Sequence, residues 1–181
     1  KDYPKAISYY EKAATGLNDY AIQEQLSQLY RLSGNTKRAD SLLKKIIEAM
    51  NNDGKKGEQD QNIGHYADRE LAYAYLLEND NENALKHALI EYNRRPENID
   101  VNETVAWVYY KMKEYDKALP YIKTALKTNC KNPQLLCDAG LIYAKANQKN
   151  LAKSILQEAL KNNPNIDPEL KTESENVLKT L

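Results

Sequence analysis

The side chains that most often ligate metals or act as nucleophiles are few in this chain. There are two histidines, His65 and His87, and two cysteines, Cys130 and Cys137, which stand seven residues apart. A zinc site takes three or four ligands, and neither pair has further cysteine, histidine or acidic residues at ligand spacing. We therefore expect no metal site, and solvated or helix-flanking histidines. A disulfide between the cysteines stays open as an alternative.

Motifs for cofactor binding and covalent catalysis do not occur. The sequence has no GxGxxG, P-loop or GxSxG pattern, so we expect no cofactor and no enzymatic activity. Its 26 basic and 26 acidic residues cancel, and the pair Arg94-Arg95 is too small for a nucleic-acid patch and suits a helix C-terminus better. No apolar run is long enough to cross a membrane, so we expect neither nucleic acid nor membrane insertion for this chain.

The sequence repeats with a period near 34 residues. Alanines in similar surroundings mark the repeat, and four of them follow a tyrosine by nine residues. The alanines are Ala6, Ala39, Ala84, Ala118 and Ala152, and the tyrosines are Tyr30, Tyr75, Tyr109 and Tyr143. One interval is 11 residues longer, and its excess falls in the polar, glycine-containing segment 51–61. A fixed period of this length indicates stacked supersecondary units, and segment 51–63 is expected to be an inserted surface loop.

Each repeat contains two stretches of helical hydrophobic periodicity separated by a short break. Gly34, Asn79 and Asn147 stand in these breaks and tolerate the left-handed conformation that ends a helix, whereas Lys113 is an exception. Asp167 and Pro168 suit the start of a final capping helix. The expected helices are 4–15, 20–33, 36–50, 64–78, 81–95, 99–112, 115–129, 133–146, 149–162 and 167–181.

The last repeat has the residues of a known pattern: Leu136, Ala139, Gly140, Tyr143, Ala152, Leu156 and Pro164. In this it resembles the tetratricopeptide repeat (TPR) family. The resemblance implies an all-α fold, a right-handed superhelix or α-solenoid of antiparallel helix pairs, with a C-terminal capping helix. The units would be a half repeat at 1–18, repeats at 19–50, 64–97, 98–132 and 133–166, and the cap at 167–181. The position of Gly140 is expected to require a small residue, because paired helices approach closely there.

The resemblance also implies which residues line a groove, because the first helix of each TPR faces it. These candidate partner-binding residues are Tyr66, Arg69, Tyr73, Glu103, Trp107, Tyr110 and Leu141. Aromatic residues flanked by charges suit a peptide ligand, and the alternative is that the aromatics only pack between helices. The lysines and asparagines with which some TPR proteins clamp chaperone tails are missing at the matching positions, so we do not expect that ligand.

The expected function is a protein-interaction module that binds a peptide segment of a partner. Two alternatives are a scaffold that self-associates through its N-terminal edge, and the regulatory part of a longer sensor or enzyme. The first helix lacks an antiparallel partner, so we expect an earlier part of the array or another chain to cover it. The compartment stays open between the bacterial cytoplasm and the periplasm. The chain resembles the C-terminal repeats of uncharacterised bacterial TPR proteins, many of which carry an export signal, and this resemblance favours the cell envelope.

Overall fold

A computed structural model describes residues 2–17, 19–59, 67–161 and 166–181; for 55–59 it describes the backbone. The chain divides into two compact units, Lys1–Ala84 and Leu85–Leu181. The part of the chain described is helical and contains no strand, which confirms the all-α prediction. No helix within it is long and apolar enough to span a membrane.

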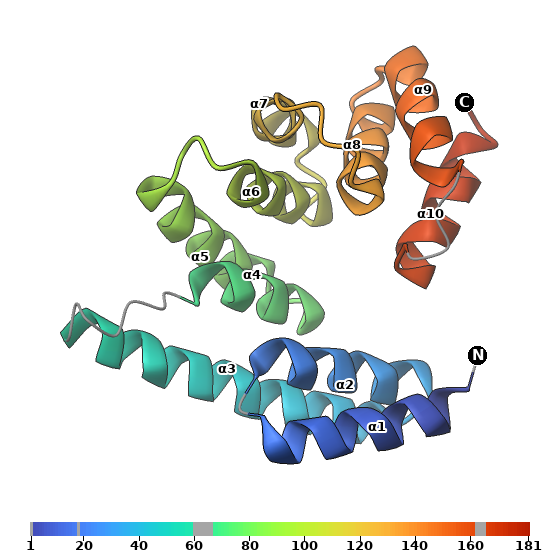
Figure 1. Ribbon diagram of the computed structural model, residues 1–181. Coiled ribbons are helices and arrows are strands. Elements are labelled where there is room, and N and C mark those ends of the chain that lie inside the picture. The colour runs from blue at the N-terminus through green and yellow to red at the C-terminus, as the bar shows by residue number, and fades with distance from the viewer. Residues whose placement is uncertain (1, 18, 60–66, 162–165) are drawn as a thin grey trace. The chain divides into compact units, whose positions relative to one another are not determined.

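Ten helices are described, in the order and number that the sequence predicts (Figure 1). They are α1 (Tyr3–Gly16), α2 (Tyr20–Leu32), α3 (Thr36–Gln59), α4 (Asp68–Leu77), α5 (Asn81–Arg94), α6 (Ile99–Lys111), α7 (Tyr115–Ala125), α8 (Pro133–Lys145), α9 (Lys149–Leu160) and α10 (Pro168–Leu178). Asp2, Asp19, Asn98, Asn132 and Asp167 cap α1, α2, α6, α8 and α10 by accepting main-chain hydrogen bonds.

The expected surface loop at 51–63 is wrong over its first part, because α3 continues to Gln59. Residues 60–63 lie outside the described part. The longer helix is held by its neighbours: the Tyr20 hydroxyl of α2 donates to the Asp53 carboxylate, and Asn51 bonds to the Tyr75 hydroxyl of α4. A mid-helix glycine, Gly54, costs about 1 kcal/mol relative to alanine, so it weakens a helix without ending it. A polar, glycine-containing segment was therefore mistaken for a break.

The breaks inside the helix pairs share one cap geometry. The second residue after the end of each first helix, directly after the C-cap residue, has a positive φ. The main-chain N–H that follows donates back to the carbonyl oxygen of the repeat tyrosine, with N to O distances of 2.8–2.9 Å. This is the Schellman arrangement, which turns the chain back on itself. The positive-φ residues are Gly34, Asn79, Lys113 and Asn147, and the acceptors are Tyr30, Tyr75, Tyr109 and Tyr143. Lys113 thus adopts the same conformation as the glycine and asparagines.

Two small apolar clusters can be described in the first unit, among residues 2–17, 19–54 and 67–84. One joins Leu26 and Tyr30 of α2 to Ala39 of α3, with side chains of α1 packed against it only partly buried. The other is built from α3 and α4 around Leu43 and Leu71. No residue of α1 that the structure describes is buried, so this helix adds little to the core.

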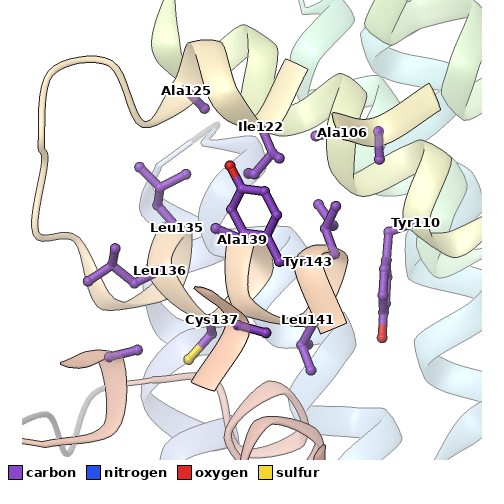
Figure 2. Packing of buried hydrophobic residues seen from close by; sticks show 14 of the residues in the cluster. Ala106, Tyr110, Ile122, Ala125, Leu135, Leu136, Cys137, Ala139, Leu141 and Tyr143 are labelled. Atoms are coloured by element: carbon purple, nitrogen blue, oxygen red, sulfur yellow. The ribbon is translucent and has the colours of Figure 1, made fainter. Parts of the chain in front are cut away.

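Among the described residues of the second unit, a large apolar cluster spans α6 to α10, and α6 pairs with α7 and α8 with α9. Figure 2 shows Tyr143 of α8 facing Ile122 of α7, while Cys137 and Leu141 point to the opposite side of α8. A Cβ atom at Gly140 would lie 2.5 Å from the Leu156 side chain of α9. The close approach expected at Gly140 is therefore present.

The C-terminal helix α10 packs on α8 and α9. It buries Leu170 and Ser174, and Ile166 just before it is buried as well. Because Leu170 and Ile166 belong to the same core cluster as Leu141, α10 closes the second unit in the way expected of a cap.

Candidate peptide-binding surfaces

The structure places the predicted groove residues in two separate units, and each set is described by itself. Tyr66 lies outside the described residues. Arg69 and Tyr73 lie one turn apart on α4 of the first unit, both half-buried, with the Arg69 guanidinium 5.4 Å from the centre of the Tyr73 ring. This cation–π contact orients both side chains along one side of α4.

A carboxyl group of α2 faces the same side. Glu24 is half-buried, and its Oε1 atom is shielded from solvent without a hydrogen-bond partner among the described residues. Burial raises its pKa to about 7; Glu70 adds to the rise and Arg69 opposes it. The influence of Arg69 on this pKa indicates that Glu24 of α2 and Arg69 of α4 are close enough to interact.

In the second unit, Trp107 of α6 keeps part of its side chain exposed. All residues from Val101 to Val108 are buried except Trp107, which is only half-buried. Its ring stacks on Tyr110, with centroids 4.8 Å apart and planes inclined by 8°, and the Lys111 Nζ atom lies 4.6 Å from its centre. Glu103, one turn before Trp107, is buried. A rigid aromatic surface with charges on either side is thus built from one helix.

The other two predicted residues of this unit are covered. Leu141 has no exposed surface and Tyr110 retains 6%. The Tyr110 hydroxyl donates to Glu173 of α10 at 2.6 Å, and burial, together with Glu173, raises its pKa. The sequence predicts that both residues face the groove, but it does not predict that α10 lies over them. Hydrophobic periodicity indicates which face of a helix a residue lies on and does not indicate which other helix packs on that face.

Sequence reasoning missed Asp138. This residue of α8 is 2% exposed, and its Oδ1 atom is buried without a hydrogen-bond partner among the described residues. Burial raises its pKa well above the usual value; Glu103 and the more distant acids Glu173 and Asp167 add to the rise, whereas Lys111 lowers it. The available signal was an acid inside an otherwise apolar run, from Leu135 to Tyr143.

The remaining candidates for chemistry are not brought together. Both cysteines are free thiols, and the described residues contain no group of histidines, cysteines and acids able to hold a metal ion. His87 is buried in α5, contrary to the expectation that it is solvated, and His65 lies outside the described residues. Arg94 and Arg95 both pair with the buried carboxylate of Glu91.

Comparison with known proteins agrees with the repeat pattern. The family model for the tetratricopeptide repeat matches residues 99–129 and 133–166, which contain the helix pairs α6–α7 and α8–α9. This part of the chain thus matches two tetratricopeptide repeats. No curated protein matches its sequence.

Solved TPR structures resemble the whole chain in fold. YrrB, a TPR protein with an unusual peptide-binding site, is 14% identical, with a TM-score of 0.50 over 97% of this chain and 84% of YrrB. MamA from Desulfovibrio magneticus RS-1 is 16% identical, with a TM-score of 0.53 over 91% of this chain and 89% of MamA. The TPR domain of P58(IPK) is 17% identical, with a TM-score of 0.51 over 99% of this chain and 52% of that one. The TPR fold supports a role in protein–protein interaction.

Proposed function

We propose that this TPR chain binds a peptide segment of a partner protein through its predicted groove residues. In the first unit these are Arg69 and Tyr73, and in the second Glu103 and Trp107. Both sets combine an aromatic ring with charges held in place by neighbouring side chains. Such rings give contact area at a low cost in side-chain entropy, which is why they dominate binding energy at many interfaces.

The half-exposed position of Trp107 carries the proposal. All the other residues from Val101 to Val108 are buried, so Trp107 could have been buried in the core as well. Instead the largest apolar side chain of the helix keeps part of its surface in water, at about 25 cal/mol for each Å² left exposed. Its orientation is fixed by Tyr110 and Lys111 rather than left free. An ordered, partly exposed tryptophan beside charges is typical of a binding hot spot.

The experiment is capture of partner proteins by the full chain, with identification of what is bound, followed by affinity measurement for that partner. We expect Trp107→Ala and Tyr73→Ala to weaken binding at least tenfold, corresponding to about 1.4 kcal/mol or more, with unchanged helix content. The matched control is Tyr9→Ala, because Tyr9 is 61% exposed on α1 and is not a groove residue. Equal affinity of all three variants would refute the assignment of the groove.

A second candidate function is self-association through α1. Two of the most exposed large apolar side chains, Tyr9 and Leu17, lie on α1 and just after it, and no described residue of α1 is buried. Light scattering over a range of concentrations separates the candidates. A dimer that Tyr9→Asp returns to monomer would favour the scaffold, whereas a monomer at high concentration would exclude it.

A further inference from the structure

The C-terminal helix lies on part of the predicted binding surface of the second unit. Glu173 of α10 accepts the hydrogen bond of Tyr110, a groove residue of α6. Ser174, the next residue, lies beside the Cys137 thiol of α8 and lowers its pKa, against the rise that burial causes. Leu141 stands one turn after Cys137 on the same side of α8. Helix α10 therefore occupies the positions that a ligand of the last repeat would contact.

The contact between α10 and this surface is poorly matched in polarity. Asp138 is 2% exposed, and its Oδ1 atom is buried without a hydrogen-bond partner among the described residues. Leaving a buried polar atom without a partner costs about 1–3 kcal/mol. Apolar contacts of Leu170 and Ile166 hold α10 in place against this cost.

The contact is also poorly matched in charge. Asp138 of α8 has three acidic neighbours. Glu103 lies on α6, and α10 and its N-cap add Glu173 and Asp167. All three of these neighbours raise the pKa of Asp138, and Lys111 of α6 opposes them. Like charges brought together in a site shielded from water repel, so the residues of α10 do not supply the charge that this site would favour. A cation would supply it.

We infer that α10 is an internal competitor for this surface, and that the segment which displaces it carries a lysine or arginine beside its apolar side chains. The basic side chain pairs with the Asp138 carboxylate, and the apolar ones replace Leu170 on Leu141. The inference rests on the proposed function, since it names the partner chemistry and the control of the same surface. It differs from the proposed function because it requires α10 to leave this surface when the ligand binds.

The two free cysteines and the single tryptophan supply separate readouts for binding and for release of α10. In a Cys130→Ser variant of the full chain, Cys137 is the one thiol left, and it is buried beside Ser174. Its rate of alkylation therefore reports exposure of the surface under α10. Trp107 fluorescence reports binding at α6. The probe is a synthetic amphipathic peptide of leucine and lysine, with a leucine–glutamate peptide of the same pattern as control.

We expect the lysine peptide to change Trp107 fluorescence and to raise the alkylation rate of Cys137 several-fold, and the glutamate peptide to do neither. Asp138→Asn, nearly identical in shape, is expected to weaken the lysine peptide several-fold. If fluorescence changes while Cys137 stays protected, the proposed function stands and the displacement of α10 is refuted. If the chain dimerises as Cys137 becomes reactive, α10 of a second copy is the occupant and the inference is equally refuted.

A pair of charge reversals on α10 completes the test. Glu173→Lys brings a cation to the acidic site from α10 itself, so we expect slower alkylation of Cys137 and weaker binding of the lysine peptide. Glu175→Lys makes the same change in charge at an exposed position of α10 and is the matched control. Equal effects of the two variants would show that net charge, rather than the site around Asp138, decides binding, and would overturn the inference.

Discussion

The two units carry the same repeat but bury their inner helices to very different extents. In the second unit every residue of α8 from Leu135 to Tyr143 is buried, whereas α2 of the first unit buries only Leu26, Ser27 and Tyr30. Each unit holds an inner carboxyl group with a shielded, unpartnered oxygen, Glu24 in one and Asp138 in the other. The difference is the cover: α10 packs on α8 and is itself partly buried, at Leu170 and Ser174, whereas no described residue of α1 is buried. The repeat sets which face points inward, and the neighbouring helix sets whether that face is open.

The largest effect is expected from Leu141→Ala, because Leu141 is fully buried although the repeat pattern places it at the groove. Truncation of a buried leucine removes apolar contacts and leaves a cavity, so we expect a loss of about 2–5 kcal/mol in the free energy of unfolding of the second unit. Denaturation followed by Trp107 fluorescence measures it. Leu151→Ala, at a position 43% exposed on α9, is the control. A Leu141 variant as stable as the control would show that α10 does not cover this residue.

The next effect is the pH dependence that Glu24 gives the first unit. Its pKa of about 7 in the folded chain exceeds the ordinary value of 4.5. Between these values the unfolded chain releases the proton and the folded chain keeps it, so the contribution of Glu24 to stability is greatest below pH 4.5 and falls until about pH 7. Because Glu24 is partly exposed, we expect a loss on the order of 2 kcal/mol across this window.

Unfolding of the first unit followed by hydrogen exchange at several pH values measures this loss. Glu24→Gln is expected to remove most of the slope without changing the fold. Glu48→Gln, at an exposed position on α3, is the control and should leave the slope intact. The same slope in the Glu24 and Glu48 variants would contradict the pKa of Glu24.

Replacing a glycine by alanine is expected to change stability in opposite directions in the two units. At Gly140 an added Cβ atom would lie 2.5 Å from Leu156, so Gly140→Ala is expected to cost about 1–3 kcal/mol through overpacking of α8 against α9. The melting of the second unit, followed by Trp107 fluorescence, measures this cost. Unchanged stability would show that the two helices are not in close contact at this point.

The smallest effect is expected at Gly54, where an added Cβ atom meets nothing within 4 Å. Since Gly54 lies inside α3, Gly54→Ala should stabilise the first unit by about 0.5–1 kcal/mol. Hydrogen exchange of the α3 amides measures the gain. No change in their protection would restore the interpretation of this segment as a loop.

The fold could be predicted from the sequence because each of its local signals is repeated. The tyrosines that mark the period, from Tyr30 to Tyr143, also supply the carbonyl oxygens of the repeated caps, so a single residue type predicts both the period and the turns. The end of α3 could not be predicted. Its polar turns are held by Tyr20 and Tyr75, which lie far away in the sequence. Local composition does not contain that information.

The candidate surface could be predicted only in part. The repeat predicts the helix face on which Trp107 and Glu103 lie, whereas the burial of Tyr110 and Leu141 depends on where α10 packs. The acid at Asp138 was overlooked because an apolar run draws attention to its apolar members. A helix pattern predicts a side chain's direction and leaves its solvent exposure to tertiary contacts.

A ligand of the second unit and α10 are proposed to compete for one surface. Hydrogen exchange of the full chain with and without the leucine–lysine peptide tests this competition directly, since it follows α6 and α10 in the same sample. We predict slower exchange of amides in α6 (Ile99–Lys111) and faster exchange in α10 (Pro168–Leu178) on binding. Slower exchange in α6 with unchanged or slower exchange in α10 would contradict the claim.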